Sequence, residues 1–224
     1  MAVGFQAEAR AEAAGWAKDT TATIQVLLAA AAAAAEAGFA REAIALGEAA
    51  RNRAGLSSSV VFALFPFPYR RVIEAEAAEH CVDPLLMAAL IRQESRFDPR
   101  ARSRRGARGM SQVLPRTGAA MSARLGIRPW DPDLLYVPDF NLHFGARFLE
   151  ERLRLDWLPV HALFASYDAG PERIARWRRW PEFNDIDLFV ERLPIAETRD
   201  YVRIVYANYR WYRRVYGAQP GAGR

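Results

Sequence analysis

Apolar residues recur at helical spacing through most of the chain, and residues 83–95 give the clearest case. Asp83 suits the N-cap of a helix, and Pro84 suits the first helical position, where its missing N–H removes no hydrogen bond. Four side chains at positions i, i+3, i+4 and i+7 share one face of this helix: Met87, Leu90, Ile91 and Glu94. The pattern therefore predicts a helix whose apolar face ends in a carboxylate.

Glu94 lies close to the end of this predicted helix, because Asp98-Pro99 disfavours its continuation. Partial burial and the negative end of the helix dipole would both raise the pKa of a glutamate there. A glutamate with a raised pKa can act as a general acid at neutral pH. The alternative is a solvated glutamate at the edge of the apolar face.

The first 55 residues predict two or three packed helices. The alanine-rich run at residues 26–35 is preceded by Glu8 and Glu12, where a signal peptide would have basic residues, so we expect a helix and see no signal peptide. Gly38 and Gly55 are expected to end the helices on either side of residues 40–53. The segment resembles the end of a helical array and has no fixed repeat.

Two prolines at residues 66 and 68 interrupt the helical pattern and mark a boundary. Further helices are predicted at residues 69–80, 140–153 and 160–167. A last helix is expected to start at Thr198, as its N-cap, and to end at Gly217, with Tyr201 and Ile204 among the residues at core spacing. Residues 218–224 are expected to form a disordered tail.

The composition narrows the choice of partner and cofactor. The net charge is +5 and Lys18 is the only lysine, so arginine carries the excess; an anionic wall polymer, a nucleic acid or an acidic lipid would each fit. Cys81 is the only cysteine, which excludes an internal disulfide. The three histidines, at positions 80, 143 and 161, lack any close metal-ligand spacing, so we expect no metal and no cofactor. No apolar run is long enough to cross a bilayer.

An arginine- and glycine-rich loop follows Glu94, and here the sequence resembles a known family. The residues concerned are Ile91-Arg-Gln-Glu94-Ser95, Phe97-Asp-Pro99, Ser103, Gly106-Ala107, Gly109, Gln112, Pro115 and Thr117. Three later blocks keep the same order: Asn141-Leu-His-Phe-Gly145-Ala146, then Ser166-Tyr167-Asp168-Ala169-Gly170-Pro171, then a closing segment of Phe189-Val-Glu191-Arg-Leu-Pro194, Glu197-Thr198-Arg199 and Tyr201-Val202. Together they resemble the catalytic domain of the soluble lytic transglycosylases.

The resemblance implies a mainly α, lysozyme-like domain at residues 62–217, with at most a very small β element, preceded by an alanine-rich helical segment at residues 1–61. It implies cleavage of the bond between N-acetylmuramic acid and N-acetylglucosamine, with formation of a 1,6-anhydro sugar and Glu94 as the single acid and base. Four further residues match sugar-binding positions: Ser103, Gln112, Tyr167 and Glu191. The alternative to sugar binding is a turn cap for Ser103 and a core position for Tyr167. Glu197 lies close to Glu191 in the sequence, and either of the two could face the cleft.

Three positions depart from the family pattern: Ser111, Leu114 and Asp168. Asp168 stands where asparagine is usual, and as a second carboxylate it could activate water, which would make the chain a lysozyme-type muramidase. A non-catalytic module that binds peptidoglycan is the other alternative. The resemblance implies peptidoglycan glycan strands as the partner, no nucleic acid, a monomer, and a location in the periplasm or cell envelope.

Overall fold

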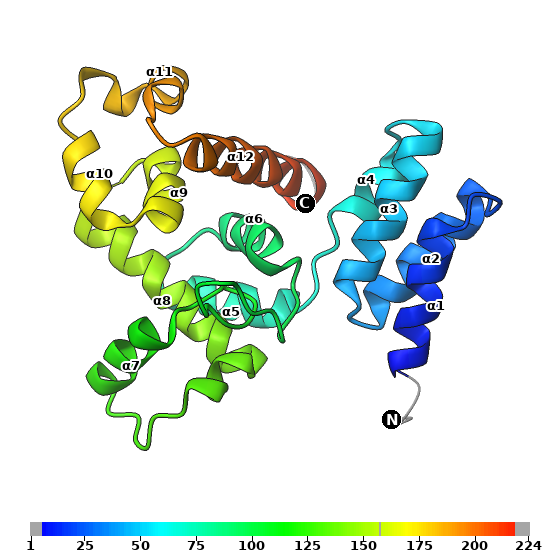
Figure 1. The fold of residues 1–224 in the computed structure, drawn as a ribbon, viewed down its shortest axis with the longest axis horizontal. Coiled ribbons are helices and arrows are strands. Elements are labelled where there is room, and N and C mark those ends of the chain that lie inside the picture. Colours follow the sequence, from blue (N-terminus) through cyan, green and yellow to red (C-terminus); the bar gives the residue numbers. More distant parts are fainter. Residues whose placement is uncertain (1–5, 157, 218–224) are drawn as a thin grey trace, which may run out of the picture. The chain divides into compact units, whose positions relative to one another are not determined.

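The computed structural model describes residues 6–156 and 158–217, and within them the chain is almost wholly helical (Figure 1). It divides into two compact units. The first comprises residues 1–71 with residues 96–98, and the second comprises residues 72–95 and 99–224. This division falls near residue 71, close to the interruption predicted at Pro66 and Pro68 and ten residues after the expected end of the helical segment at residue 61. The expected tail at residues 218–224 lies outside the described residues.

The first unit is a small helical bundle with an alanine-rich core. Its four helices are α1 (Gln6–Lys18), α2 (Ile24–Glu36), α3 (Ala40–Ala54) and α4 (Ser58–Leu64). Thr23 caps α2 through its side chain, and Gly38 and Gly55 both adopt positive φ where the chain leaves α2 and α3. The alanine-rich run is therefore helical, as predicted. Asp98 belongs to this unit and accepts a hydrogen bond from Arg41 at 2.9 Å.

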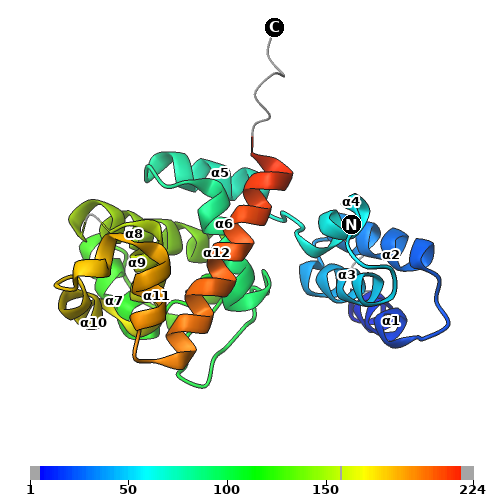
Figure 2. The same cartoon turned by 90° about the horizontal axis from the view of Figure 1, so that it is seen from above.

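The second unit is built around the predicted helix α6 (Pro84–Ser95). Its other α-helices are α5 (Arg70–Glu79), α7 (Pro115–Arg124), α8 (Pro138–Asp156), α9 (Val160–Ala169), α10 (Pro171–Trp177), α11 (Ile186–Arg192) and α12 (Ala196–Tyr216), with short 3-10 turns at η1 (Pro132–Tyr136) and η2 (Pro181–Asn184). α12 packs against both α6 and α9, as the two views in Figures 1 and 2 agree. A long C-terminal helix thus covers the helix that carries Glu94.

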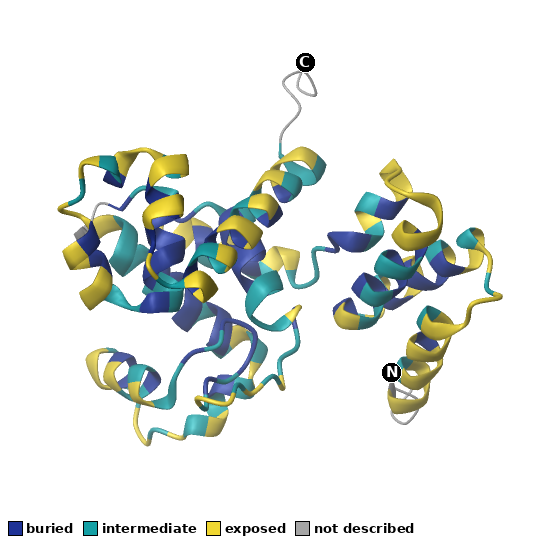
Figure 3. Cartoon of the chain, turned by 45° about the horizontal axis from the view of Figure 1, so that its top comes forward, coloured by how far each residue is buried: buried dark blue, intermediate teal, exposed yellow. Residues whose placement is uncertain are grey.

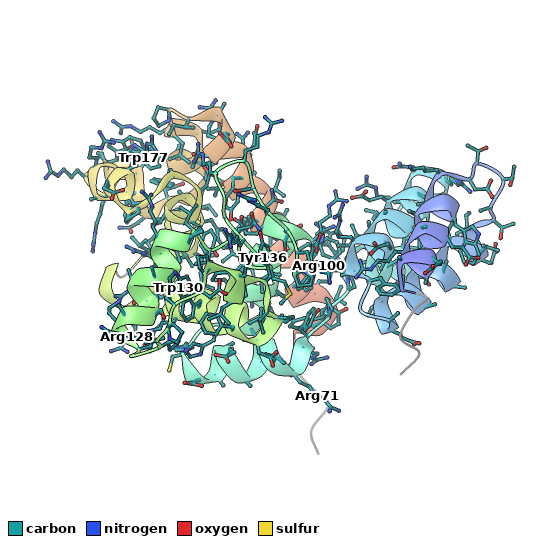
Figure 4. The ribbon with its side chains drawn as sticks, turned by 60° about the horizontal axis from the view of Figure 1, so that its bottom comes forward. Arg71, Arg100, Arg128, Trp130, Tyr136 and Trp177 are labelled. Atoms are coloured by element: carbon teal, nitrogen blue, oxygen red, sulfur yellow. The ribbon has the colours of Figure 1, made fainter. Side chains whose placement is uncertain are left out.

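Burial in α6 extends beyond the predicted apolar face of Met87, Leu90 and Ile91. Its residues from Leu86 to Ile91 are all buried, and the buried positions of α6 and α9 form the centre of the unit (Figure 3). A second cluster packs Trp130 against Phe144, with nearly parallel rings 6.2 Å apart, beneath the loop that leads into α7. Figure 4 labels Trp130 and Tyr136 in the segment between α7 and α8.

The structure corrects two details of the predicted last helix. α12 begins at Ala196 with Ile195 as its N-cap, so Thr198 lies inside the helix and is buried. Ile204 is 45% exposed and does not face the core. The small β element consists of two isolated antiparallel bridges, which pair Arg102 with Arg108 and Arg108 with Val113.

Candidate active site

Glu94 lies in the last turn of α6, where local sequence and packing both fix its position. The Asp83 carboxylate caps the helix by accepting a hydrogen bond from the Leu85 N–H at 2.8 Å. At the other end, the Ser95 hydroxyl donates to the Met110 carbonyl at 2.8 Å and so joins the helix end to the loop that follows. Glu94 is only partly buried, on the same face as the buried Ile91.

Two side chains, Tyr201 on α12 and Asp168 on α9, influence the pKa of Glu94 together with its burial. The Tyr201 hydroxyl donates a hydrogen bond to Glu94 Oε1. Burial raises the pKa of Glu94 to about 7 and is the largest effect; the Tyr201 hydrogen bond opposes it, and the negative charge of Asp168 adds to it. Glu94 is therefore protonated and ionised in comparable amounts near neutral pH, as a group that both gives and takes a proton requires.

Tyr167 and Asp168 reach the site from consecutive positions of α9. The Tyr167 hydroxyl donates to the Ser111 carbonyl at 2.6 Å, and burial together with the charge of Glu94 raises its pKa well above the ordinary value. Asp168 Oδ2 accepts a hydrogen bond from the Thr198 hydroxyl at 2.6 Å. Tyr167 thus remains a neutral hydroxyl, and one oxygen of Asp168 is already bound by protein.

The loop at residues 101–114 holds two of the predicted sugar-binding residues, and both side chains stabilise the loop itself. Ser103 Oγ accepts a hydrogen bond from the Ala107 N–H at 3.0 Å, which is the turn-capping role considered for it. Gln112 has a positive φ of 49°, and its side-chain amide donates to the Gly109 carbonyl at 2.8 Å. The same amide lies 3.3 Å from the Ala101 carbonyl.

Asn141, on α8, holds this loop in place through three hydrogen bonds. Its buried side chain accepts a hydrogen bond from the Ser111 N–H at 2.7 Å and donates to the carbonyls of Arg108 and Leu135 at 3.0 and 2.8 Å. Gly109 has a φ of 73°, and a Cβ there would lie 2.1 Å from the Leu135 carbonyl oxygen. Only glycine fits between the loop and this carbonyl.

Ser111, one of the departures from the family pattern, is buried against α8. A Cβ on Gly145 would lie 2.3 Å from Ser111 Oγ, so the side chain rests directly on the glycine backbone. The Ser111 carbonyl accepts a hydrogen bond from the Tyr167 hydroxyl, and this bond connects the loop to α9. Ser111 thus contributes to the site through its backbone.

Glu191 lies elsewhere in the unit. Its exposed carboxylate pairs with Arg203, and it lines a groove of about 300 Å³ between α11 and α12 with Val202, Tyr206 and Arg210. Glu197, its competitor in the sequence, is exposed as well. The structure therefore brings Glu94, Tyr167 and Asp168 together and leaves Glu191 outside that group.

Two residues of the site, Tyr201 and Thr198, belong to the segment that resembles the end of the family's domain, but the sequence predicted only a core residue and an N-cap for them. They lie on adjacent turns of α12 and face Glu94 and Asp168 respectively. A signal was present, since two polar hydroxyls occupy the face that also carries the buried Val202 and Val205.

Residues 71–190 match the family described as Transglycosylase SLT domain, and the chain therefore belongs to that family. The soluble lytic murein transglycosylase of Escherichia coli (strain K12) is 29% identical to it over 158 residues, which are 70% of this chain and 24% of the relative. The corresponding protein of Salmonella typhimurium is 30% identical over 157 residues, covering 68% and 24%. The chain thus spans about a quarter of the length of these relatives.

Solved structures agree with this assignment. An inactive glutamate-to-glutamine mutant of the lytic transglycosylase Slt from Pseudomonas aeruginosa is 28% identical, with a TM-score of 0.76 over 94% of this chain and 33% of that one. The 70 kDa soluble lytic transglycosylase of Escherichia coli shares the fold, with a TM-score of 0.77 over 94% and 33% at 24% identity. The mainly α, lysozyme-like fold expected from the sequence is confirmed.

Proposed function

We propose that this chain is a peptidoglycan lytic transglycosylase that cleaves the β-1,4 bond between N-acetylmuramic acid and N-acetylglucosamine. One observation carries the proposal: a single partly buried glutamate, Glu94, has its pKa raised to about 7 and is held by a tyrosine hydroxyl. The named activities of the relatives, and the inactivity of a glutamate-to-glutamine mutant of one of them, support it.

In the first step Glu94 acts as the general acid. Because Tyr201 donates to Oε1, the other carboxyl oxygen carries the proton and gives it to the glycosidic oxygen. The bond from that oxygen to C1 of the muramoyl sugar breaks, and the oxygen leaves as the hydroxyl of N-acetylglucosamine. The N-acetyl group of the substrate stabilises the oxocarbenium-like state, as in other glycosidases that use substrate assistance.

In the second step the ionised Glu94 acts as the base. It takes the proton of the muramoyl C6 hydroxyl while that oxygen bonds to C1, which forms the 1,6-anhydro ring and restores the acid. No water is consumed. A group that is half protonated near pH 7 can serve both steps without a large free-energy penalty for either protonation state.

The neighbouring carboxylates bear on the choice between this reaction and hydrolysis. Ordinary glycosidases place a second carboxylate about 5 to 9.5 Å from the acid. Asp98 is paired with Arg41, and Asp168 is bound by the Thr198 hydroxyl. Asp168 still acts on the pKa of Glu94, so a muramidase in which it activates water is the second candidate.

We assign sugar binding to the residues that the family resemblance indicates, with roles suited to their contacts. Gln112 uses its amide N–H within the loop, which leaves its Oε1 as the acceptor for a sugar hydroxyl. Tyr167 offers an aromatic ring and a neutral hydroxyl beside Glu94. Ser103 supports the loop, and Glu191 belongs to a more distant part of the glycan path.

The experiment that tests the proposal is mass spectrometry of fragments released from purified sacculi by the chain and by Glu94→Gln. Anhydromuramoyl ends that disappear in the variant would support the transglycosylase. Reducing ends that disappear in Asp168→Asn would establish the muramidase instead. Saturable binding to sacculi without soluble fragments, from folded protein, would establish a binding module.

A ligand assay that needs no turnover complements this experiment. A 70-kDa soluble lytic transglycosylase forms a complex with bulgecin A, and we propose that this chain binds it too. Titration of bulgecin A into Glu94→Gln protein measures whether the sugar site is intact when cleavage is lost. Absence of binding in both proteins would count against the assigned site.

The partner and location follow from the same proposal. We assign the chain to the cell envelope, with peptidoglycan glycan strands as its substrate, and expect a monomer that does not bind nucleic acid. Among the described residues, no helix combines the length and the apolar character needed to cross a membrane.

A further inference from the structure

A second cluster of titratable residues lies between α5 and α8, apart from the helices that surround Glu94. Glu76 lies near the end of α5 and His80 directly follows that helix, and both contact α8 residues: Glu76 contacts His143, and His80 contacts Glu150. His143 Nδ1 lies 2.9 Å from Glu76 Oε2, and His80 Nδ1 lies 2.8 Å from Glu150 Oε2. The three potential ligand atoms of Glu76, His80 and His143 all lie within 4.8 Å of one another.

The buried His80 side chain has one nitrogen without a partner. His80 is only 4% exposed, and its Nε2 atom is buried without a hydrogen-bond partner, 3.8 Å from Glu76 Oε2. The other ring nitrogen faces the Glu150 carboxylate, which fixes the proton on Nδ1 and leaves a lone pair on Nε2. Buried polar atoms in proteins are nearly always satisfied, so this lone pair calls for a ligand.

We propose that Glu76, His80 and His143 bind a divalent transition-metal ion of the zinc type, with Glu150 as the carboxylate that orients His80. Two imidazole nitrogens and one carboxylate oxygen suit Zn²⁺, Co²⁺ or Ni²⁺ better than Mg²⁺ or Ca²⁺, which prefer oxygen ligands. The Glu150 carboxylate is itself held by Arg154 at 2.6 Å, so the arrangement from arginine to carboxylate to histidine is already built.

The separations are close to those that a bound ion needs. Zinc bonds of about 2.0 to 2.1 Å in a tetrahedron place neighbouring ligand atoms about 3.3 Å apart. Glu76 Oε2 is 2.9 Å from His143 Nδ1 and 3.8 Å from His80 Nε2, which bracket that value. The side chain of His143 is 29% exposed, so its ring can turn to bring Nδ1 closer to the His80 nitrogen, from which it now lies within 4.8 Å. A water molecule can fill the fourth coordination position of the ion. The ion replaces the proton between His143 and Glu76.

A bound ion would join α5 to α8 and stabilise the second unit. α8 also carries Asn141 and Gly145, which support the loop beside Glu94, so the same helix links the two sites. An ion that binds only the folded chain raises its melting temperature in proportion to the logarithm of the free ion concentration. This inference does not depend on the proposed function, because its readouts are binding and stability.

The test uses the full chain, freed of any histidine tag and of bound metal with a chelator. Isothermal titration with Zn²⁺ is expected to give one ion per chain, and the melting temperature is expected to rise. His143→Gln should weaken Zn²⁺ binding at least tenfold and remove the rise in melting temperature. Glu150→Gln keeps all three ligands and should weaken binding about tenfold.

Two controls separate this site from other zinc-binding groups. Cys81→Ser removes the exposed thiol next to His80, and His161→Gln removes the third histidine, which bonds the Phe183 carbonyl. Both should bind Zn²⁺ as the unaltered chain does. No stoichiometric binding at 100-fold excess over protein, unchanged binding in folded His143→Gln, or loss of binding in Cys81→Ser would each overturn the proposal. Glu76→Gln replaces His143→Gln if circular dichroism shows that the latter is unfolded.

Discussion

The raised pKa of Glu94 predicts that this glutamate reduces the stability of the folded chain. Its pKa is about 7 when folded, against an ordinary value of 4.5. Between these two pH values the folded chain keeps a proton that the unfolded chain has lost, so the free energy of unfolding falls as pH rises. A difference of about 2.5 pH units, at 1.36 kcal/mol per unit, corresponds to about 3 kcal/mol lost by pH 7 and above.

Glu94→Gln removes this penalty because glutamine resembles the protonated acid at every pH. We expect the variant and the unaltered chain to have similar stability at pH 4, and the variant to be more stable by about 3 kcal/mol at pH 8. Urea denaturation at several pH values between 4 and 8.5, followed by circular dichroism, measures the difference. The pH dependence carries the prediction, since a change in packing alone would shift stability equally at all pH values.

Two results would refute the reasoning. A stability difference that stays constant across this pH range would mean that Glu94 titrates near its ordinary value in the folded chain. A variant that is less stable at pH 8 would mean that the ionised carboxylate is favourably bound. In either case the pKa of Glu94 would no longer support its assignment as the general acid.

Three further changes test the surroundings of Glu94. Tyr201→Phe removes a hydrogen bond that lowers the pKa of Glu94 and is worth about 1.5 to 3 kcal/mol. The alkaline limb of the pH–rate profile on sacculi should therefore move up by about 1 to 2 pH units, and an unchanged limb would contradict this role of Tyr201. Asp168→Asn removes a charge that raises the pKa of Glu94, so the same limb should move down, and an upward shift would exclude this role. Asn141→Ala removes three hydrogen bonds that hold the loop at residues 101–114 and should lower the free energy of unfolding, measured by urea titration, by about 2 to 4 kcal/mol. A change below about 1 kcal/mol would show that the loop does not depend on Asn141.

The parts of the fold that the sequence could predict are those whose information is local. The cap at Asp83, the apolar face of α6 and the place of Glu94 on it all lie within thirteen residues, and the structure has them as expected. The alanine-rich helix α2 could equally be predicted from its composition and from the acidic residues on either side of it.

The parts that escaped prediction depend on residues far apart in the chain. Tyr201 and Glu94 are separated by 107 positions, and nothing in either local pattern indicates that they meet. Thr198 was wrongly predicted as an N-cap because threonine favours that position, whereas here its hydroxyl is used inside the helix by Asp168. The histidines were judged by their spacing along the chain, whereas the fold brings the rings of His80 and His143 to a distance of 5.1 Å.

The position of Tyr201 on α12 also determines when the site can form during synthesis. The ribosome makes Glu94 about a hundred residues before α12, the helix that packs against α6, so a nascent chain holds this carboxylate without its Tyr201 partner. Only when α12 is complete can it pack against α6 and α9 and bring the Tyr201 hydroxyl to Glu94. An unfinished or truncated chain that lacks α12 therefore has Glu94 without its tyrosine partner, and the site described here is complete only when this last helix has folded onto α6.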